Sequence, residues 1–216
     1  MRYSLIVFDW DGTLIDSAAG IVESIQEAAR DLQLPVPTRE TASHVIGLGL
    51  QDSLRTAVPT LPEARYREFA DAYRRHFRAR QDTMAPFPGA RELLRDLHAA
   101  GHRLAVATGK SRRGLEHALE ATALRPYFGA TRCADETIPK PHPAMLLELM
   151  AELAALPDQA LMIGDTSHDL EMARSASVDA VAVSYGAHPG AALRALAPRA
   201  CVASVAELRA WLTANA

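Results

Sequence analysis

The sequence is poor in cysteine, in long apolar runs and in excess charge of either sign. Its only cysteines among 216 residues, Cys133 and Cys201, are too few for a disulfide framework or a cysteine-based zinc cluster, so we expect a reducing compartment. No run of about 18 apolar residues occurs, so we expect no membrane-spanning helix. The formal net charge of -3 gives no indication of a nucleic-acid or anionic-membrane partner. The first apolar run is short and soon meets acids, so we also expect no signal peptide and a cytoplasmic protein.

Short apolar runs and amphipathic segments make up most of the chain. The composition, 49% hydrophobic and 23% charged, is ordinary for a globular protein. Strands that alternate with helices predict a parallel sheet covered on both faces, so we expect an α/β fold with a Rossmann-like core. The predicted strands are Ser4–Phe8, His102–Thr108, Ala160–Asp165 and Asp179–Tyr185, and the predicted helices of this core are Gly89–Gly101, Ser111–Thr122, His142–Leu153 and His168–Ala176.

The segment between the first two predicted strands differs from the rest because its patterns are helical and contain no convincing strand. Two stretches have helical spacing, a proline-rich break separates them, and a linker with two prolines follows. The helical stretches are Ala18–Leu32 and Pro62–Gln81, the break is Leu34–Thr38, and the linker is Ala85–Ala90. The sequence therefore predicts a helical insert, residues 17–85, within a core formed by residues 1–16 and 86–216.

The carboxyl ends of three predicted strands carry residues suited to chemistry. Asp9 and Asp11 follow the first strand, Thr108 to Ser111 end the second, and Gly164 to Asp169 end the third. Lys140 lies in a proline-rich segment before the third strand. Parallel α/β sheets bind ligands at this edge, so we expect these residues to converge.

Several carboxylates cannot share one site without cations, because their charges repel. Magnesium suits oxygen ligands of this kind, and Lys140 would supply further positive charge. A phosphate group would fit such a site, because the metal, the lysine, the Thr108 hydroxyl and backbone amides at a helix start could all neutralise it.

Four segments, in this order and spacing, resemble the motifs of the haloacid dehalogenase-like (HAD) hydrolase superfamily. They are DWDGT from Asp9, ATGKS from Ala107, KPHP from Lys140 and GDTSHD from Gly164. The resemblance covers essentially the whole chain and is nearest to the phosphoglycolate-phosphatase-like group. The insert resembles the helical cap of the first type in this superfamily.

The resemblance implies a role for each motif acid. Asp9 would be the nucleophile that forms an aspartyl-phosphate, and Asp11 would protonate the leaving alcohol and then accept a proton from water. The Asp9 and Asp165 carboxylates and the Asp11 backbone carbonyl would hold Mg²⁺. Asp169 would support the metal shell through water.

The resemblance also implies how the phosphate is held. The Thr108 hydroxyl and the Gly109 amide would bind its oxygens, and Lys140 would steady the charges of Asp9 and the phosphate. Gly12 would let the chain turn sharply beside the phosphate. On a continued strand, the side chains of Asp9 and Asp11 would point the same way.

The spacing of Asp165 and Asp169 puts them on one helical face if a helix starts immediately.

For several other residues near the motifs, we expect a structural role rather than a catalytic one. For Lys110 we favour a solvated helix-start lysine over a substrate contact, although it stays a candidate for substrate binding. Trp10 would fill space under the cap. His142 would begin a helix, His168 would flank the acidic loop, and Ser177 would occupy a left-handed helix end where the family usually has Gly.

The residues favour a phosphomonoester hydrolase over the other reactions of the superfamily. A dehalogenase has no leaving alcohol for Asp11 to protonate, and Ala18–Gln33 lacks the lysine with which a phosphonatase forms its Schiff base. A phosphomutase of the β-phosphoglucomutase type shares the four motifs, but Asp16–Ile21 lacks the histidine that such mutases carry. A pyrophosphatase or a catalytically silent binding module are further alternatives, and the intact motif acids argue against the silent module.

Substrate selection falls to residues 44–54, which correspond by position to the family's specificity loop. Gly47 permits close approach of a small ligand, and His44, Gln51 and Arg55 offer polar contacts. We expect a small phosphorylated metabolite, with phosphoglycolate as the first candidate and a sugar phosphate, pyrophosphate or nucleoside monophosphate as others. We expect no nucleic-acid or membrane partner, and a monomer.

Overall fold

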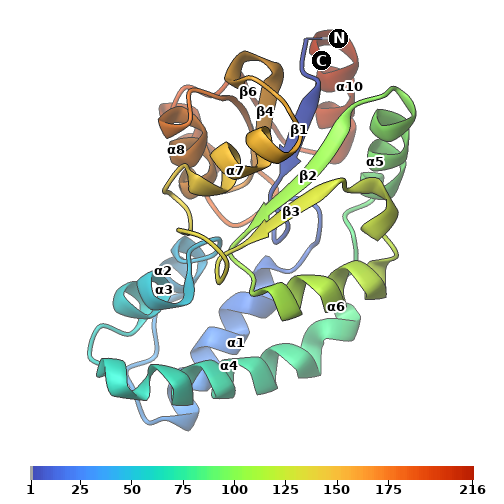
Figure 1. Ribbon diagram of the computed structural model, residues 1–216. Coiled ribbons are helices and arrows are strands. Elements are labelled where there is room, and N and C mark those ends of the chain that lie inside the picture. Colours follow the sequence, from blue (N-terminus) through green and yellow to red (C-terminus); the bar gives the residue numbers. More distant parts are fainter. Residues whose placement is uncertain (1) are drawn as a thin grey trace.

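The computed structural model describes residues 2–216, which contain a six-stranded sheet in which every neighbouring pair is parallel (Figure 1). The strand order is β3-β2-β1-β4-β5-β6. The strands are β1 (Leu5–Phe8), β2 (Arg103–Thr108), β3 (Ala130–Cys133), β4 (Ala160–Gly164), β5 (Asp179–Val183) and β6 (Ala200–Val202). The predicted α/β fold is confirmed, and the central position of β1 brings its carboxyl end between those of β2 and β4.

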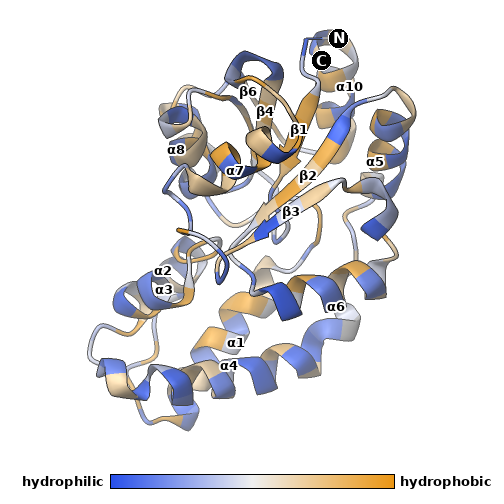
Figure 2. Cartoon of the chain, in the orientation of Figure 1, coloured by the Kyte–Doolittle hydropathy of each residue, from blue (hydrophilic) through white to orange (hydrophobic). Residues whose placement is uncertain are grey.

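Helices cover both faces of the sheet because the strand side chains alternate between two cores. In β1, Ile6 and Phe8 join one hydrophobic core, and Leu5 and Val7 join the other. The first core includes residues of α5 (Ala90–Ala99), α6 (Arg112–Thr122) and α10 (Val205–Asn215), and the second those of α7 (Ala144–Glu152), α8 (Ser167–Ser175) and α9 (Gly190–Ala195). Figure 2 shows β1 and most of β2 in the hydrophobic colour, with a hydrophilic segment at the start of β2.

Four further helices lie together beyond the carboxyl edge of the sheet, below it in Figure 1. They share a hydrophobic core of their own. They are α1 (Ala18–Asp31), α2 (Arg39–His44), α3 (Leu50–Ala57) and α4 (Tyr66–Arg80). Elsewhere along the chain, short 3-10 helices span Glu63–Arg65, Gln81–Thr83, Arg125–Tyr127 and Pro157–Gln159. We call α1 to α4 the cap. The two chain segments that join it to the sheet meet where Asp16 N–H donates to the Ala85 carbonyl at 3.0 Å.

The strand predictions were incomplete, because β3 and β6 were missed. Each has a single strand neighbour at an edge of the sheet, and β3 (Ala-Thr-Arg-Cys) and β6 (Ala-Cys-Val) are short. Edge strands tolerate polar and charged side chains, so Thr131 and Arg132 interrupt any apolar run in β3, whereas β6 has only three residues and is too short for a periodic signal.

Two local predictions have different outcomes. The segment 44–54 is not one loop, because α2 ends at His44 and α3 begins at Leu50. The left-handed position at Ser177 is confirmed, with φ of 57°, two residues after α8 ends. Both cysteines are free thiols, and none of the helices within residues 2–216 has the length and apolar character needed to cross a membrane.

Candidate active site

The carboxyl edge of the central strands is lined by buried polar residues. Asp9 continues the ladder beyond β1, because its N–H donates to the Ile163 carbonyl of β4 at 2.9 Å. Thr108 ends β2, and Asp165 follows β4. Asp9, Thr108 and Asp165 are each at most 1% exposed. The sheet therefore brings together residues that lie about 50 to 150 positions apart in the chain, as the strand-end argument predicts.

Lys140 lies between two aspartates in the interior. Its Nζ is 2.6 Å from Asp9 Oδ1 and 2.6 Å from Asp169 Oδ1, and its side chain is fully buried. Burial alone would lower the pKa of Lys140, but the carboxylates of Asp169 and Asp9 outweigh it and raise that pKa overall. Lys140 is therefore a fixed cation of the site.

Asp169 is held by the start of α8. Its Oδ2 accepts hydrogen bonds from the Thr166 N–H at 3.1 Å and from the Thr166 hydroxyl at 2.7 Å. Because α8 begins at Ser167, Asp165 precedes the helix and does not share a helical face with Asp169. Direct pairing with Lys140 also gives Asp169 a second partner that the sequence did not predict.

Asp165 is fixed by two donors that sequence reasoning missed. Thr13 Oγ1 donates to Oδ1 at 2.8 Å, and the Ala187 N–H donates to Oδ2 at 2.7 Å. Gly12 packs directly against this carboxylate, with φ of +81°, and a Cβ there would lie 2.2 Å from Asp165 Oδ2. Only glycine fits this turn, which gives Gly12 a structural reason besides any contact with phosphate.

The three carboxylates of Asp9, Asp165 and Asp169 suit a hard cation. One oxygen from each lies within 4.8 Å of the others, and the buried Asp9 Oδ2 has no hydrogen-bond partner within residues 2–216. Burial raises the pKa of Asp9 to about 7 although Lys140 opposes the rise, and burial followed by the charges of Asp9 and Asp169 raises the pKa of Asp165. A cation would relieve this cost, so the residues fit Mg²⁺.

Both carboxylate oxygens of Asp11 have partners. Ser17 Oγ donates to Oδ1 at 2.7 Å, and Lys110 Nζ lies 2.9 Å from Oδ2. The interpretation of Lys110 as a solvated lysine is wrong, because its side chain is 12% exposed and its ammonium lies 4.6 Å from the centroid of the Phe77 ring. Strand β1 ends at Phe8 and its ladder pairing continues only to the Asp9 N–H, so Asp11 does not lie on a continued strand.

The cap loop between α2 and α3 closes over this edge. A Cβ on Gly109 would lie 2.7 Å from the Gly47 carbonyl oxygen, and a Cβ on Gly47 would lie 3.4 Å from Thr166 Oγ1. Gln51 is exposed on α3, and Arg55 forms exposed ion pairs with neighbouring cap acids. Across residues 2–216, neither is joined by a hydrogen bond or ion pair to the motif acids. The structure thus brings Gly47 to the site, whereas the contact of Gln51 and Arg55 with substrate stays a prediction.

Three histidines join the cap to the core beside the site. The His44 carbonyl at the end of α2 accepts from His168 Nε2 at 2.8 Å and from His188 Nε2 at 3.1 Å. His188 Nδ1 accepts the Ser167 N–H at 3.0 Å, so both of its ring nitrogens are engaged, and burial lowers its pKa to about 4. The cluster is thus a hydrogen-bonded contact between cap and core. Sequence reasoning missed His188, which lies in no motif.

Two other predicted neighbours of the site have structural roles. Trp10 does not lie under the cap, because it is 1% exposed in the sheet core, where its ring centroid is 6.3 Å from that of Phe128. His142 stands just before α7, and its Nδ1 accepts the Ala144 N–H at 3.2 Å, which agrees with the predicted helix-start position.

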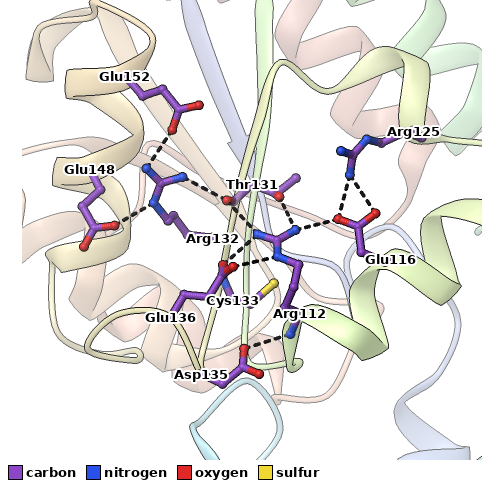
Figure 3. Close-up of polar contacts among 10 residues, drawn as sticks. All are labelled: Arg112, Glu116, Arg125, Thr131, Arg132, Cys133, Asp135, Glu136, Glu148 and Glu152. Carbon is purple, nitrogen blue, oxygen red and sulfur yellow. Dashed lines mark hydrogen bonds and ion pairs between the residues drawn. The ribbon is translucent and has the colours of Figure 1, made fainter.

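A polar network ties the loop after β2 to the segment that leads to Lys140 (Figure 3). Arg112 is its centre: its guanidinium donates to both Glu136 oxygens, at 2.8 and 2.7 Å, and to Glu116 and Thr131. Its backbone N–H donates to Asp135 Oδ1 at 2.8 Å. All five guanidinium N–H groups have acceptors, so Arg112 is a rigid tie that a lysine could not reproduce.

Comparison with known proteins agrees with this geometry. The family model described as haloacid dehalogenase-like hydrolase matches residues 6–183. A relative from Dickeya dadantii, the probable phosphatase IndB, is 38% identical over 94% of this chain and 91% of its own length. A phosphoglycolate phosphatase from Agrobacterium fabrum is 31% identical over 84% of this chain and 81% of its own.

The fold of this chain is also similar to that of solved phosphatase-like proteins. The crystal structure of a predicted phosphatase from Clostridium acetobutylicum superposes with a TM-score of 0.87 and 27% identity, over 99% of this chain and 100% of that chain. The family match spans the cap and the strands from β1 to β5, with three of the four motifs at the ends of β1, β2 and β4 and KPHP between β3 and α7. The chain therefore belongs to the haloacid dehalogenase-like hydrolase family, in which it groups with the phosphoglycolate-phosphatase-like phosphatases.

Proposed function

We propose that the protein is a Mg²⁺-dependent phosphomonoester hydrolase in which Asp9 is the nucleophile. The state of the Asp9 carboxylate carries this proposal: Lys140 holds Oδ1 at 2.6 Å, whereas the buried Oδ2 has no hydrogen-bond partner within residues 2–216. A buried carboxylate oxygen without a partner is costly, which suits an atom that meets a cation or a phosphorus atom during the reaction.

The reaction consists of two displacements at phosphorus. In the first, an Asp9 oxygen bonds to phosphorus, the bond from phosphorus to the ester oxygen breaks, and Asp11 gives its proton to that oxygen. In the second, a water oxygen bonds to phosphorus, the bond to Asp9 breaks, and Asp11 accepts the proton that the water loses. The cycle ends with inorganic phosphate, an ionised Asp9 and a protonated Asp11, as it began.

Cations and donors at the strand ends support the charge that moves during these steps. Lys140 would bind a phosphoryl oxygen while it holds Asp9, and the Thr108 hydroxyl and Gly109 N–H would bind two others. The Asp9 and Asp165 carboxylates and the Asp11 carbonyl would hold Mg²⁺, with Asp169 behind them through Lys140 and Thr166. When bound, the ion offsets the repulsion between Asp9 and an anionic substrate.

The closed cap loop favours a small substrate. The Gly47 carbonyl lies so close to Gly109 that even a methyl group on Gly109 would approach it to 2.7 Å, so little room is left over the phosphate-binding loop. A compact phosphorylated acid such as phosphoglycolate is our first candidate, with sugar phosphates, pyrophosphate and nucleoside monophosphates as alternatives.

The first test is a phosphate-release screen over phosphorylated metabolites and pyrophosphate, with Mg²⁺ and with a chelator. We expect metal-dependent release that Asp9→Asn abolishes, while the exposed variant Arg113→Met, chosen as a matched control, keeps its activity. Preference for pyrophosphate would make the protein a pyrophosphatase. Phosphate transfer between two positions of a sugar without release would indicate a mutase. If the folded wild-type protein binds Mg²⁺ but turns over none of the compounds, the result would indicate a silent binding module.

A further inference from the structure

Lys110 is the one lysine whose contacts the proposed phosphoryl transfer leaves unexplained. The chain has two lysines, and Lys140 is committed to Asp9 and Asp169. Lys110 instead pairs with Asp11 on its core side, at 2.9 Å, and meets the Phe77 ring of the cap at 4.6 Å on the other. It therefore connects the cap helix α4 to the residue that handles the proton.

The grip on Asp11 is geometrically specific. Ser17 Oγ holds one carboxylate oxygen at 2.7 Å, and the Lys110 ammonium holds the other at 2.9 Å. Two donors on opposite oxygens fix the rotation of the carboxyl group, which otherwise turns easily about its last bond. A proton donor must present one oxygen to the leaving atom at hydrogen-bond distance, so this rotation decides whether the transfer succeeds.

Phe77 explains why the Lys110 ammonium stays at this place. Lysine has a flexible four-carbon stem and a strongly hydrated head, so a lone lysine at the rim of a site would turn to water. The Phe77 ring, stacked on Tyr73 one turn earlier at 5.6 Å, offers its face to the ammonium instead. Burial raises the pKa of Tyr73, and the charge of Asp11 adds to the rise, in agreement with a position near that carboxylate.

We propose that Lys110, backed by the Phe77 ring of the cap, is a positioning residue that aims the Asp11 carboxyl at the leaving oxygen. This inference rests on the proposed function, because it assumes that Asp11 protonates the leaving group. It assigns a role to α4 that differs from substrate selection: α4 helps to orient the proton donor, through one cation.

The proposal predicts that the activity lost without Lys110 depends on the leaving group of the substrate. An alkyl phosphate expels a basic alkoxide and needs the proton from Asp11, whereas p-nitrophenyl phosphate expels a stable phenolate and does not. Loss of the Asp11 orientation should therefore impair alkyl phosphates and spare p-nitrophenyl phosphate. A merely structural loss would lower both activities together.

The test compares kcat/KM for the best alkyl phosphate of the screen with that for p-nitrophenyl phosphate, in Mg²⁺, for wild type and Lys110→Met. We expect the alkyl phosphate value to fall by about 10- to 100-fold, part of the roughly 100- to 10,000-fold that a general acid contributes, and the aryl phosphate value to fall by about threefold or less. Lys110→Arg keeps a cation beside Asp11 and should recover part of the alkyl phosphate activity.

Two further variants keep the proposal testable if Lys110→Met does not fold. Phe77→Leu should give the same selective loss, to a smaller extent, and Phe77→Tyr should restore the ring face and the activity. The control Arg113→Met, an exposed cation on the same helix start, should leave both substrates unchanged. Equal losses for the two substrates in the Lys110 and Phe77 variants, or no loss, would overturn the inference alone. A wild-type protein that releases phosphate from neither substrate would overturn the proposed function and the inference with it.

Discussion

The two lysines of this chain each pair with a motif aspartate, but in opposite surroundings. Lys140 is fully buried between Asp9 and Asp169, all within the core. Lys110 is partly exposed and lies between Asp11 of the core and Phe77 of the cap. Asp9, the proposed nucleophile, therefore has its countercharge built into the sheet edge, whereas Asp11, the proposed proton donor, depends on a contact that the cap completes.

Removing the buried lysine should have the largest effect. Lys140→Met leaves the Asp9 and Asp169 carboxylates buried without their cation, which should destabilise the metal-free protein by about 3–5 kcal/mol and abolish phosphate release. The matched change Lys110→Met removes a pair whose side chains are 12% and 11% exposed and leaves Asp11 its Ser17 hydrogen bond, so it should cost less, about 1–3 kcal/mol. Urea unfolding in chelator at pH 8 measures both. Equal stability losses for the two variants would remove the distinction between the sites.

Neutralising Asp9, the proposed nucleophile, should stabilise the metal-free protein while it abolishes turnover. The folded pKa of Asp9 is raised from 3.8 to about 7, so its protonated form contributes stability that is complete below about pH 4 and is lost as the pH rises through 7. Asp9→Asn should therefore melt about 5 °C or more above wild type at pH 8 in chelator.

The dependence on pH provides the control for the Asp9→Asn variant. The difference in melting temperature between Asp9→Asn and wild type should shrink toward pH 4, and Mg²⁺ should shrink it at pH 8. Comparison at each pH cancels the titration of His188, whose pKa is lowered to about 4 and which loses stability in the opposite direction as the pH falls. A difference that is absent at pH 8, or constant with pH, would contradict the assigned environment of Asp9.

The Ser17 hydrogen bond to Asp11 should contribute less to activity than the Lys110 ion pair does. Ser17→Ala removes one neutral hydrogen bond to Oδ1, so we expect a cost of about 1 kcal/mol in stability. We also expect about a threefold to tenfold fall in kcat/KM for alkyl phosphates, again with p-nitrophenyl phosphate spared. The remote Thr213→Ala, at an exposed position of α10, serves as the control. A larger selective loss from Ser17→Ala than from Lys110→Met would reverse the assigned order.

The smallest effect is expected on the cap surface. Arg55 pairs with Glu63 at 2.9 Å and with Asp52 at 3.5 Å, and its side chain is 54% exposed. Such pairs contribute about 0–1 kcal/mol, so Arg55→Met should change stability by less than about 1 kcal/mol. Its kcat/KM for the best substrate should be unchanged. A loss above about tenfold, or 1.4 kcal/mol in the barrier, would return Arg55 to the substrate site.

The sequence predicted the part of the site that strand ends determine. Asp9, Thr108 and Asp165 follow apolar runs that had to be central strands, and parallel strands put their carboxyl ends on one edge. Lys140 was predicted from its motif, although the spacing alone could not say that Asp169 would be its second partner. The pairing depends on where α8 begins, and helix ends are the least certain feature of a sequence pattern.

The contacts between cap and core could not be predicted in this way. His188 and Phe77 reach the site because two packed units meet, and no period in either segment records that meeting. Lys110 was read as solvated because a helix-start lysine usually faces water, and the ring that holds it lies 33 positions earlier in the chain. Arg55 was expected to contact substrate from its position in the loop, but α3 turns it toward neighbouring cap acids.

The most direct test of the account is the covalent intermediate on Asp9. The protein would be mixed with its best substrate and Mg²⁺, quenched in acid during turnover, digested and analysed by mass spectrometry. The account predicts one added phosphoryl group on the peptide that contains Asp9, which is absent from substrate-free protein and from Asp9→Asn. Phosphate release with the phosphoryl group on another residue, or with no covalent adduct under conditions where the second displacement is slowed, would contradict it.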